Sequence, residues 1–167
     1  MTRKVAVIGL GTRGGDIAQA FHKVGWAVSG FDPDPGAEGA VDLGKDWSRE
    51  ATISATVQGA DWIVLCLPER LELLQMVIQR AQGAARKSAT VAVMTTEFNV
   101  DAVQGCAIRP EHIVRINEGE EGGYTLDVSS KTDPGLKIEA TTTLALLAAQ
   151  EFTPKDRKAQ SSRAESA

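Results

Sequence analysis

The chain has 167 residues, enough for one domain of ordinary size, and its 18 Lys and Arg against 22 Asp and Glu give a net charge of −4. This acidic balance argues against a protein that coats duplex nucleic acid, because neutralising the phosphates requires a basic face. Two cysteines are too few for the bridges of a small secreted domain, and no apolar run approaches the roughly 20 residues that span a bilayer. We therefore expect a cytoplasmic protein with neither a nucleic-acid nor a membrane partner.

The first 32 residues predict a strand, a helix and a second strand. Residues 4–8 (KVAVI) form a short apolar run, which is typical of a strand covered on both faces. Residues 14–24 place apolar side chains at helical spacing, and Gly25 follows where a helix would end. Residues 26–31 are apolar again and lead to Asp32. Such a βαβ unit makes its two strands parallel.

The middle of the chain continues this alternation. A third strand is predicted at residues 40–43, and Ser48 is a candidate cap for a helix that ends near residue 57. Residues 62–67 (WIVLCL) predict a buried strand, and residues 69–82 predict a helix that stops at Gly83.

The last part of the chain predicts further strands at 90–94, 112–116 and 124–129, with a short helix at 99–105. Asp133 and Pro134 are expected to open a final helix. Its expected apolar side consists of Ile138, Leu144, Leu147, Ala148 and Phe152. This stripe can pack on the chain's own sheet or form a dimer face, and the sequence leaves both open. Alternating strands and helices predict an α/β fold with a doubly wound, mostly parallel sheet and helices on both faces.

A glycine-rich motif joins the first strand to the first helix, namely Gly9-Leu10-Gly11-Thr12-Arg13-Gly14. It matches G-x-G-x-x-G in the strand-to-helix context that binds a dinucleotide. Gly9 permits the turn, Gly11 leaves room for a pyrophosphate, and Gly14 lets the helix approach the strand. The positive end of the helix then faces the diphosphate. The alternative is that these glycines only shape a tight turn.

The coenzyme expected at this loop is NAD rather than NADP. Asp32 lies 32 − 11 = 21 positions after the second glycine and would accept hydrogen bonds from the adenosine ribose. Its charge would repel a phosphate attached there. Arg13 could contact a phosphate, whereas Asp16, expected in the first turn of the helix, would compete with the ligand for the helix dipole.

At this point the sequence resembles a known group of enzymes. Residues 5–35 (VAVIGLGTRGGDIAQAFHKVGWAVSGFDPDP) and 59–70 (GADWIVLCLPER) are similar to the N-terminal half of prephenate dehydrogenases and of their relatives among the 6-phosphogluconate and β-hydroxyacid dehydrogenases. The resemblance covers about residues 3–116. It implies a Rossmann domain, with a nicotinamide coenzyme across the carboxyl ends of the strands. It also implies that Leu67 and Pro68 lie beside the coenzyme and that Thr95 or Thr96 lies near the nicotinamide.

The sequence departs from these relatives where they carry out proton transfer. Prephenate dehydrogenases present a histidine in a His-Pro turn after the sixth strand, where this chain has Asn117. An amide cannot accept the proton that oxidation of an alcohol releases. A serine and a lysine of the relatives are replaced by Thr96 and Phe98. The relatives also append an all-helical domain over the substrate, whereas a homodimer or a separate partner protein would have to complete the cleft here.

Two functions follow as expectations. The first is a small NAD-dependent dehydrogenase or reductase that holds a carbonyl or hydroxy substrate near Thr95, Thr96 and Asn117. The second is a non-catalytic nucleotide-binding module that senses the dinucleotide or assists a partner. In both cases residues 1–153 would form the NAD(P)-binding domain, followed by a disordered tail at 154–167.

The remaining candidates favour structural roles. His22 and His112 lack a second ligand at metal spacing, so no metal site is expected. Cys66 is interpreted as a core residue. The acidic glycine loop at residues 118–123 could hold a cation or exclude an anionic substrate, but a solvated loop is the simpler interpretation.

Overall fold

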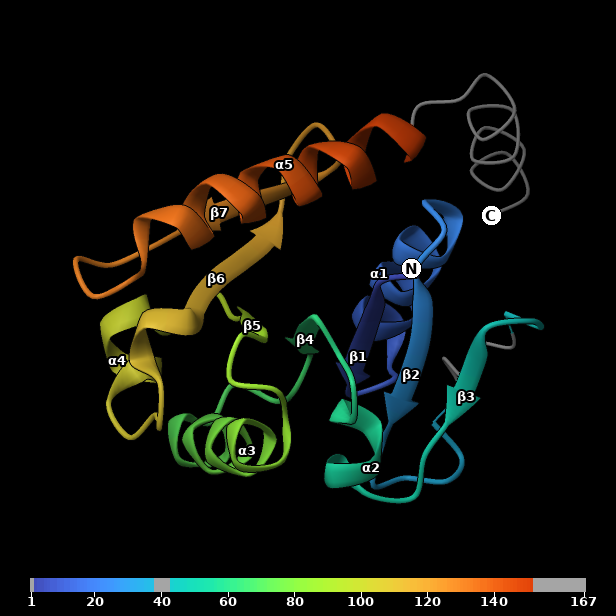
Figure 1. Ribbon diagram of the computed structural model, residues 1–167, viewed down its shortest axis with the longest axis horizontal. Coiled ribbons are helices and arrows are strands. Elements are labelled where there is room, and N and C mark those ends of the chain that lie inside the picture. Colours follow the sequence, from blue (N-terminus) through green and yellow to red (C-terminus); the bar gives the residue numbers. More distant parts are fainter. Residues whose placement is uncertain (1, 38–42, 152–167) are drawn as a thin grey trace.

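The computed structural model describes residues 2–37 and 43–151, in which a seven-stranded sheet has the order β3-β2-β1-β4-β5-β6-β7 (Figure 1). The strands are β1 (Lys4–Ile8), β2 (Ala27–Phe31), β3 (Trp47–Arg49), β4 (Trp62–Leu65), β5 (Thr90–Met94), β6 (Ile113–Glu118) and β7 (Tyr124–Asp127). Neighbouring strands are parallel except for β6 and β7, which pair antiparallel. The predicted doubly wound α/β fold is confirmed.

Helices cover both faces of this sheet. They are α1 (Thr12–Lys23), α2 (Ile53–Val57), α3 (Leu71–Ala84), α4 (Val100–Gln104) and α5 (Pro134–Glu151), with a 3₁₀ turn at Pro110–His112. Helices α1 and α5 lie on one face, and α2, α3 and α4 lie on the other (Figure 1). None of the helices in the described part of the chain is long and apolar enough to cross a membrane.

Two apolar layers hold the sheet between the helices. In β1, Val5 and Val7 belong to the layer with α1 and α5, whereas Ala6 and Ile8 belong to the layer with α2 and α3. This alternation follows from the period of two residues in a strand. The buried Trp62 packs against Phe21 of α1 with ring centroids 5.7 Å apart. The central strands are therefore buried on both faces, which is why they are continuous apolar runs in the sequence.

The edge strand beside β2 differs from the prediction. Residues 40–42 of the predicted third strand lie outside the described residues, and β3 is formed by Trp47–Arg49. Ser48 therefore lies in a strand and caps no helix. The outer backbone groups of β2 account for this pairing, because Val28 N donates to Asp46 O at 2.8 Å and Gly30 O accepts from Glu50 N at 2.8 Å. Thr52 caps the short helix α2 instead, and its Oγ1 accepts from Ala55 N at 3.1 Å.

Helices α3 and α5 also correct details of the prediction. Gly83 does not stop α3, because it does not adopt the positive φ of a C-terminal glycine cap, and the helix continues to Ala84. Ile138 is 71% exposed, so it lies on the outer side of α5. The buried residues of α5 are Leu136, Ala140, Thr143, Leu144 and Leu147. Phe152 and the predicted tail at 154–167 lie outside the described residues.

Candidate coenzyme site

The structure brings the predicted site residues to one edge of the sheet. The glycine loop follows β1, Asp32 follows β2, Leu67 and Pro68 follow β4, and Thr95 and Thr96 follow β5. These strands are parallel and adjacent in the order β2-β1-β4-β5. Their carboxyl ends therefore share one edge, which is where ligands bind in open α/β sheets.

The structure gives a different role to each of the three glycines of the motif. Gly9 has a φ of +97°, and a Cβ there would lie 2.1 Å from Cys66 O. A Cβ on Gly14 would lie 1.8 Å from Gly9 O, so this glycine lets α1 approach the loop. Gly11 has an ordinary φ of −70°, and a Cβ there would meet no other part of the described protein within 4 Å. Neither backbone conformation nor packing requires a glycine at position 11, and the space above it is open.

This open space adjoins the N-terminus of α1. Gly11 is the N-cap and offers no side chain to the N–H groups of the first turn, and that turn contains no acidic residue. Asp16 was predicted to compete there, but α1 begins at Thr12, so Asp16 falls outside the first turn and is exposed. A positive helix end without a capping side chain is suited to bind an anion.

Asp32 is fixed by the backbone on both sides. Its Oδ2 accepts from Leu10 N at 2.8 Å and its Oδ1 accepts from Asp34 N at 2.9 Å. Each carboxylate oxygen has a second lone pair, so the half-buried group can still accept from ribose hydroxyls. The Leu10 side chain is fully buried, and this residue contributes to the loop through its backbone.

Glu69 is the residue of this edge that the sequence interpretation missed. Thr95 Oγ1 donates to Glu69 Oε2 at 2.5 Å, and Thr96 N donates to Glu69 Oε1 at 3.0 Å. Burial raises the pKa of Glu69, but the hydrogen bonds from Thr95 and Thr96 and the charge of Arg13 outweigh it, so the pKa is lowered overall. The available signal was an acidic residue directly after Pro68, at the end of the strand.

The two threonines differ in what they can contact. Thr95 is fully buried, and its Oγ1 also accepts from Phe98 N at 3.3 Å. Its hydroxyl is thus committed to Glu69 and to the loop after β5. Thr96 is exposed at the same edge, and its Oγ1 donates to Glu69 Oε1 at a longer 3.5 Å. It is therefore the threonine whose hydroxyl can also reach a ligand.

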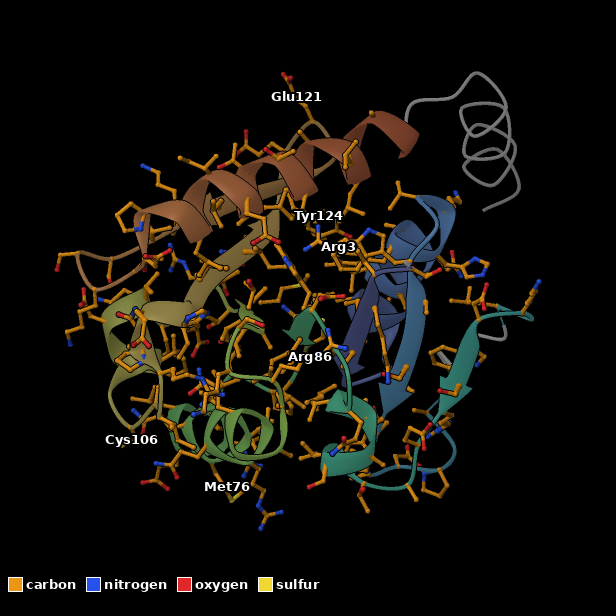
Figure 2. All side chains as sticks on the ribbon, viewed as in Figure 1. Arg3, Met76, Arg86, Cys106, Glu121 and Tyr124 are labelled. Atoms are coloured by element: carbon orange, nitrogen blue, oxygen red, sulfur yellow. The ribbon has the colours of Figure 1, made fainter. Side chains whose placement is uncertain are left out.

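Asn117 lies in a strand rather than in a turn. Strand β6 continues to Glu118, and Asn117 O accepts from Thr125 Oγ1 of β7 at 3.3 Å. The residues that follow make a tight hairpin turn, in which Gly119 N donates to Gly123 O at 2.9 Å. Figure 2 shows Glu121 projecting outward from this turn. The predicted strand after the acidic glycine loop is therefore confirmed as β7, which pairs antiparallel with β6.

The histidines of the chain lie away from this edge. His22 is in the last turn of α1, with Nε2 3.1 Å from Lys45 O, and His112 directly precedes β6. Both positions belong to the amino ends of the strands. Within residues 2–37 and 43–151, no group of three or more His, Cys, Asp or Glu could hold a metal ion.

The cysteines give a direct test of packing beneath the glycine loop. Burial raises the pKa of the Cys66 thiol to about 12, although the charge of Arg13 opposes this, whereas Cys106 is exposed. The thiolate is the reactive form. Cys66 is partly buried. We therefore expect a thiol reagent at mildly alkaline pH to modify Cys106 much faster than Cys66 in the folded chain, and both at similar rates after unfolding, as measured by mass spectrometry of peptides. Equally fast modification of both would contradict the packing of Cys66 described here.

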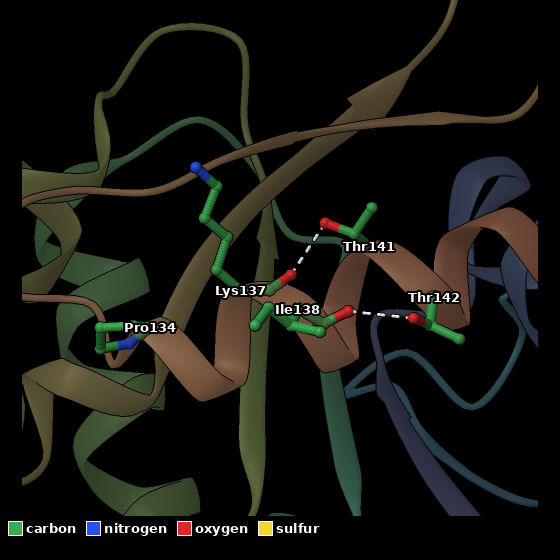
Figure 3. Close-up of a pocket in the computed structure, with 5 residues that line it drawn as sticks. All are labelled: Pro134, Lys137, Ile138, Thr141 and Thr142. Carbon is green, nitrogen blue, oxygen red and sulfur yellow. Dashed lines mark hydrogen bonds between the residues drawn. The ribbon is translucent and has the colours of Figure 1, made fainter.

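A separate shallow pocket lies on the outer side of α5. It is lined by Pro134, Lys137, Ile138, Thr141 and Thr142 (Figure 3). The two threonine hydroxyls donate to the preceding turn, to Lys137 O at 2.8 Å and Ile138 O at 3.1 Å. Because α5 covers a face of the sheet, this pocket is distinct from the edge that carries the glycine loop (Figure 1).

Comparisons with known proteins agree with this geometry. Residues 4–111 match the family described as the NAD binding domain of 6-phosphogluconate dehydrogenase. An L-carnitine dehydrogenase/betainyl-CoA thioesterase of Ruegeria pomeroyi is 36% identical over 129 residues, which are 65% of this chain and 26% of that protein. A protein of the same name from Agrobacterium fabrum is 28% identical over 130 residues, 66% of this chain and 27% of that protein. The matched region is thus about a quarter of these relatives.

Solved dehydrogenases share the fold at low sequence identity. An (S)-3-hydroxybutyryl-CoA dehydrogenase from Ralstonia eutropha gives a TM-score of 0.78 at 15% identity, covering 89% of this chain and 62% of that chain. The prephenate dehydrogenase of A. aeolicus gives 0.72 at 17% identity, covering 89% of this chain and 58% of that chain. Because the matched family spans the glycine loop, Asp32 and Glu69, the chain belongs to the NAD-binding domains of the 6-phosphogluconate dehydrogenase type.

Proposed function

We propose that the chain is the coenzyme half of an NAD-dependent dehydrogenase or reductase, which transfers hydride between nicotinamide C4 and a carbon that carries a hydroxyl or carbonyl. The observation that carries this proposal is the open space at Gly11, beside an N-terminus of α1 that no side chain caps. The coenzyme supplies the hydride chemistry when bound, and the protein supplies binding and orientation. The dehydrogenase names of the relatives support the reaction class.

The residues at the ends of β4 and β5 would serve the nicotinamide end. Leu67 and Pro68 would flank the ring, and the exposed Thr96 and the half-buried Asn117 would orient the substrate oxygen. Thr95 would act through Glu69, because its buried hydroxyl is already bonded to that carboxylate. Glu69 would in turn hold the β5 loop in place through Thr96 N.

The substrate cleft requires a cover that excludes water. We propose that a second copy of the chain or a separate protein provides it. The exposed Ile138 and Leu146 (71% and 54%) offer an apolar contact for a second protein on the outer side of α5. Because that side faces away from the edge with the glycine loop, the residues of the partner that cover the cleft would have to lie elsewhere on the same assembly.

Turnover of a small panel tests the proposed reaction. Purified chain would be mixed with NAD⁺ and, in separate assays, L-carnitine, 3-hydroxybutyryl-CoA, 6-phosphogluconate or prephenate, and formation of reduced coenzyme would be followed by absorbance. We expect a hydroxy compound of this panel to be oxidised, with activity rising with protein concentration if two copies form the cleft. Failure of NADH to bind at all would contradict the proposal.

A non-catalytic nucleotide-binding module is the second candidate. It is favoured by Asn117, which stands where prephenate dehydrogenases present a histidine, and by the positions of His22 and His112 at the opposite edge. Tight NADH binding without oxidation of any panel member, even with a partner from the same cell extract added, would favour this candidate over the dehydrogenase.

A further inference from the structure

A positively charged side chain lies beside the carboxylate that favours NAD. Strand β3 pairs in parallel with β2, with Arg49 opposite Gly30, so Arg49 ends its strand at the same edge as Asp32. Arg49 Nη2 donates to Asp34 O at 2.6 Å, and Asp34 N donates to Asp32 Oδ1 at 2.9 Å. The guanidinium and the carboxylate of Asp32 therefore contact the same residue from two sides.

The charges around this point oppose one another. The Asp32 carboxylate would repel a phosphate on the ribose 2′ position, whereas a guanidinium would attract it. A guanidinium has five N–H donors in a planar fork, which suits a phosphate better than a single point charge does. Two further carboxylates are close in the sequence, those of Asp34 and Glu50. The Asp34 carboxylate accepts from Gly36 N at 2.9 Å, and Glu50 directly follows Arg49. In the natural chain the local charge is thus negative overall.

We propose that Arg49 is a second determinant of coenzyme choice, and that its guanidinium forms a 2′-phosphate subsite which the Asp32 carboxylate keeps closed. This inference rests on the coenzyme placement of the proposed function, with the adenosine ribose at Asp32. It explains how an edge that selects NAD also contains a half-buried arginine reaching to the turn after β2. Removal of the Asp32 charge is expected to open the subsite, and the gain depends on Arg49.

A double-mutant cycle tests this dependence. The dissociation constants of NADH and NADPH would be measured by tryptophan fluorescence for the full chain and for Asp32→Ala, Arg49→Met and the double variant. We expect Asp32→Ala to bind NADPH about tenfold more tightly than the natural chain, and addition of Arg49→Met to remove most of that gain. Asp32→Ala with Arg49→Lys should keep part of it. The control Arg80→Met removes an exposed arginine of α3 and should change neither constant.

Three results would overturn the proposal. The double variant could bind NADPH as tightly as Asp32→Ala, or Asp32→Ala could gain no NADPH affinity. Arg49→Met could also weaken the binding of both coenzymes equally, which would mean that Arg49 only stabilises the turn at Asp34. Melting temperatures would verify folding, and Asp32→Asn would replace Asp32→Ala if the latter unfolds. Failure of the proposed coenzyme placement would differ from these results, because the natural chain would then not bind NADH.

Discussion

Gly11→Ala is expected to leave the chain folded and to weaken NADH binding by about 100-fold, or about 3 kcal/mol. A methyl group at this position meets no other part of the described protein within 4 Å and requires no change of φ, so it costs little in folding. It does occupy the space above the first turn of α1 where the diphosphate would approach. Calorimetric titration with NADH gives the affinity, and urea unfolding gives the stability.

Gly14→Ala is the matched substitution with the opposite expectation. Its Cβ would lie 1.8 Å from Gly9 O, which is backbone and has little room to move. We expect a loss of about 3 kcal/mol or more in the free energy of unfolding, since overpacking against rigid neighbours is among the costlier substitutions. The assignment of separate roles to the glycines would be wrong if both variants lost the same stability, or if Gly11→Ala bound NADH normally.

Glu69→Ala is expected to have the second large effect. It removes the acceptor for Thr95 Oγ1 and Thr96 N, and the buried Thr95 hydroxyl is left without that partner. An unpaired buried polar group costs about 1–3 kcal/mol, so unfolding by urea should occur at lower concentration. NADH binding should weaken as well, because the loop after β5 is no longer tied to β4. Glu72→Gln, at an exposed position of the first turn of α3, is the control and should change neither quantity.

The pH dependence of this effect has a defined sign. The pKa of Glu69 is lowered from its ordinary value of 4.5. The folded state therefore favours the carboxylate, and its contribution to stability is present above the pKa of the unfolded chain. The stability difference between the natural chain and Glu69→Gln should be constant near neutral pH and shrink as the pH falls below about 4.5 through the lower folded value. A difference that grows on acidification would contradict the lowered pKa.

The parts of the fold that could be predicted are those specified by local patterns. Residues 90–94 were predicted as a strand with the observed bounds, because a buried parallel strand is a continuous apolar run. The glycine motif was informative because its spacing, together with Asp32, reflects a geometry built within a single βαβ unit. Contacts between residues that are close in the chain produce local sequence patterns, so they can be predicted from the sequence.

The parts that were missed depend on contacts between distant residues. Glu69 and Thr95 are 26 positions apart, and no periodicity indicates that they share a hydrogen bond. The edge strand at Trp47–Arg49 is short and follows from the unpaired side of β2 rather than from its own composition. Ile138 looked like a core residue because α5 is apolar on more than one side, and only packing on the sheet decides which side is buried.

The central claim is that the coenzyme diphosphate binds at the first turn of α1, above Gly11. Titration of the isotope-labelled chain with NADH, followed by backbone amide NMR, tests this location most directly. We predict the largest shifts at the amides of residues 11–14, with smaller shifts at Asp32 and Thr96. Largest shifts at the Pro134–Thr142 pocket of α5, or no shifts at millimolar NADH, would contradict the account.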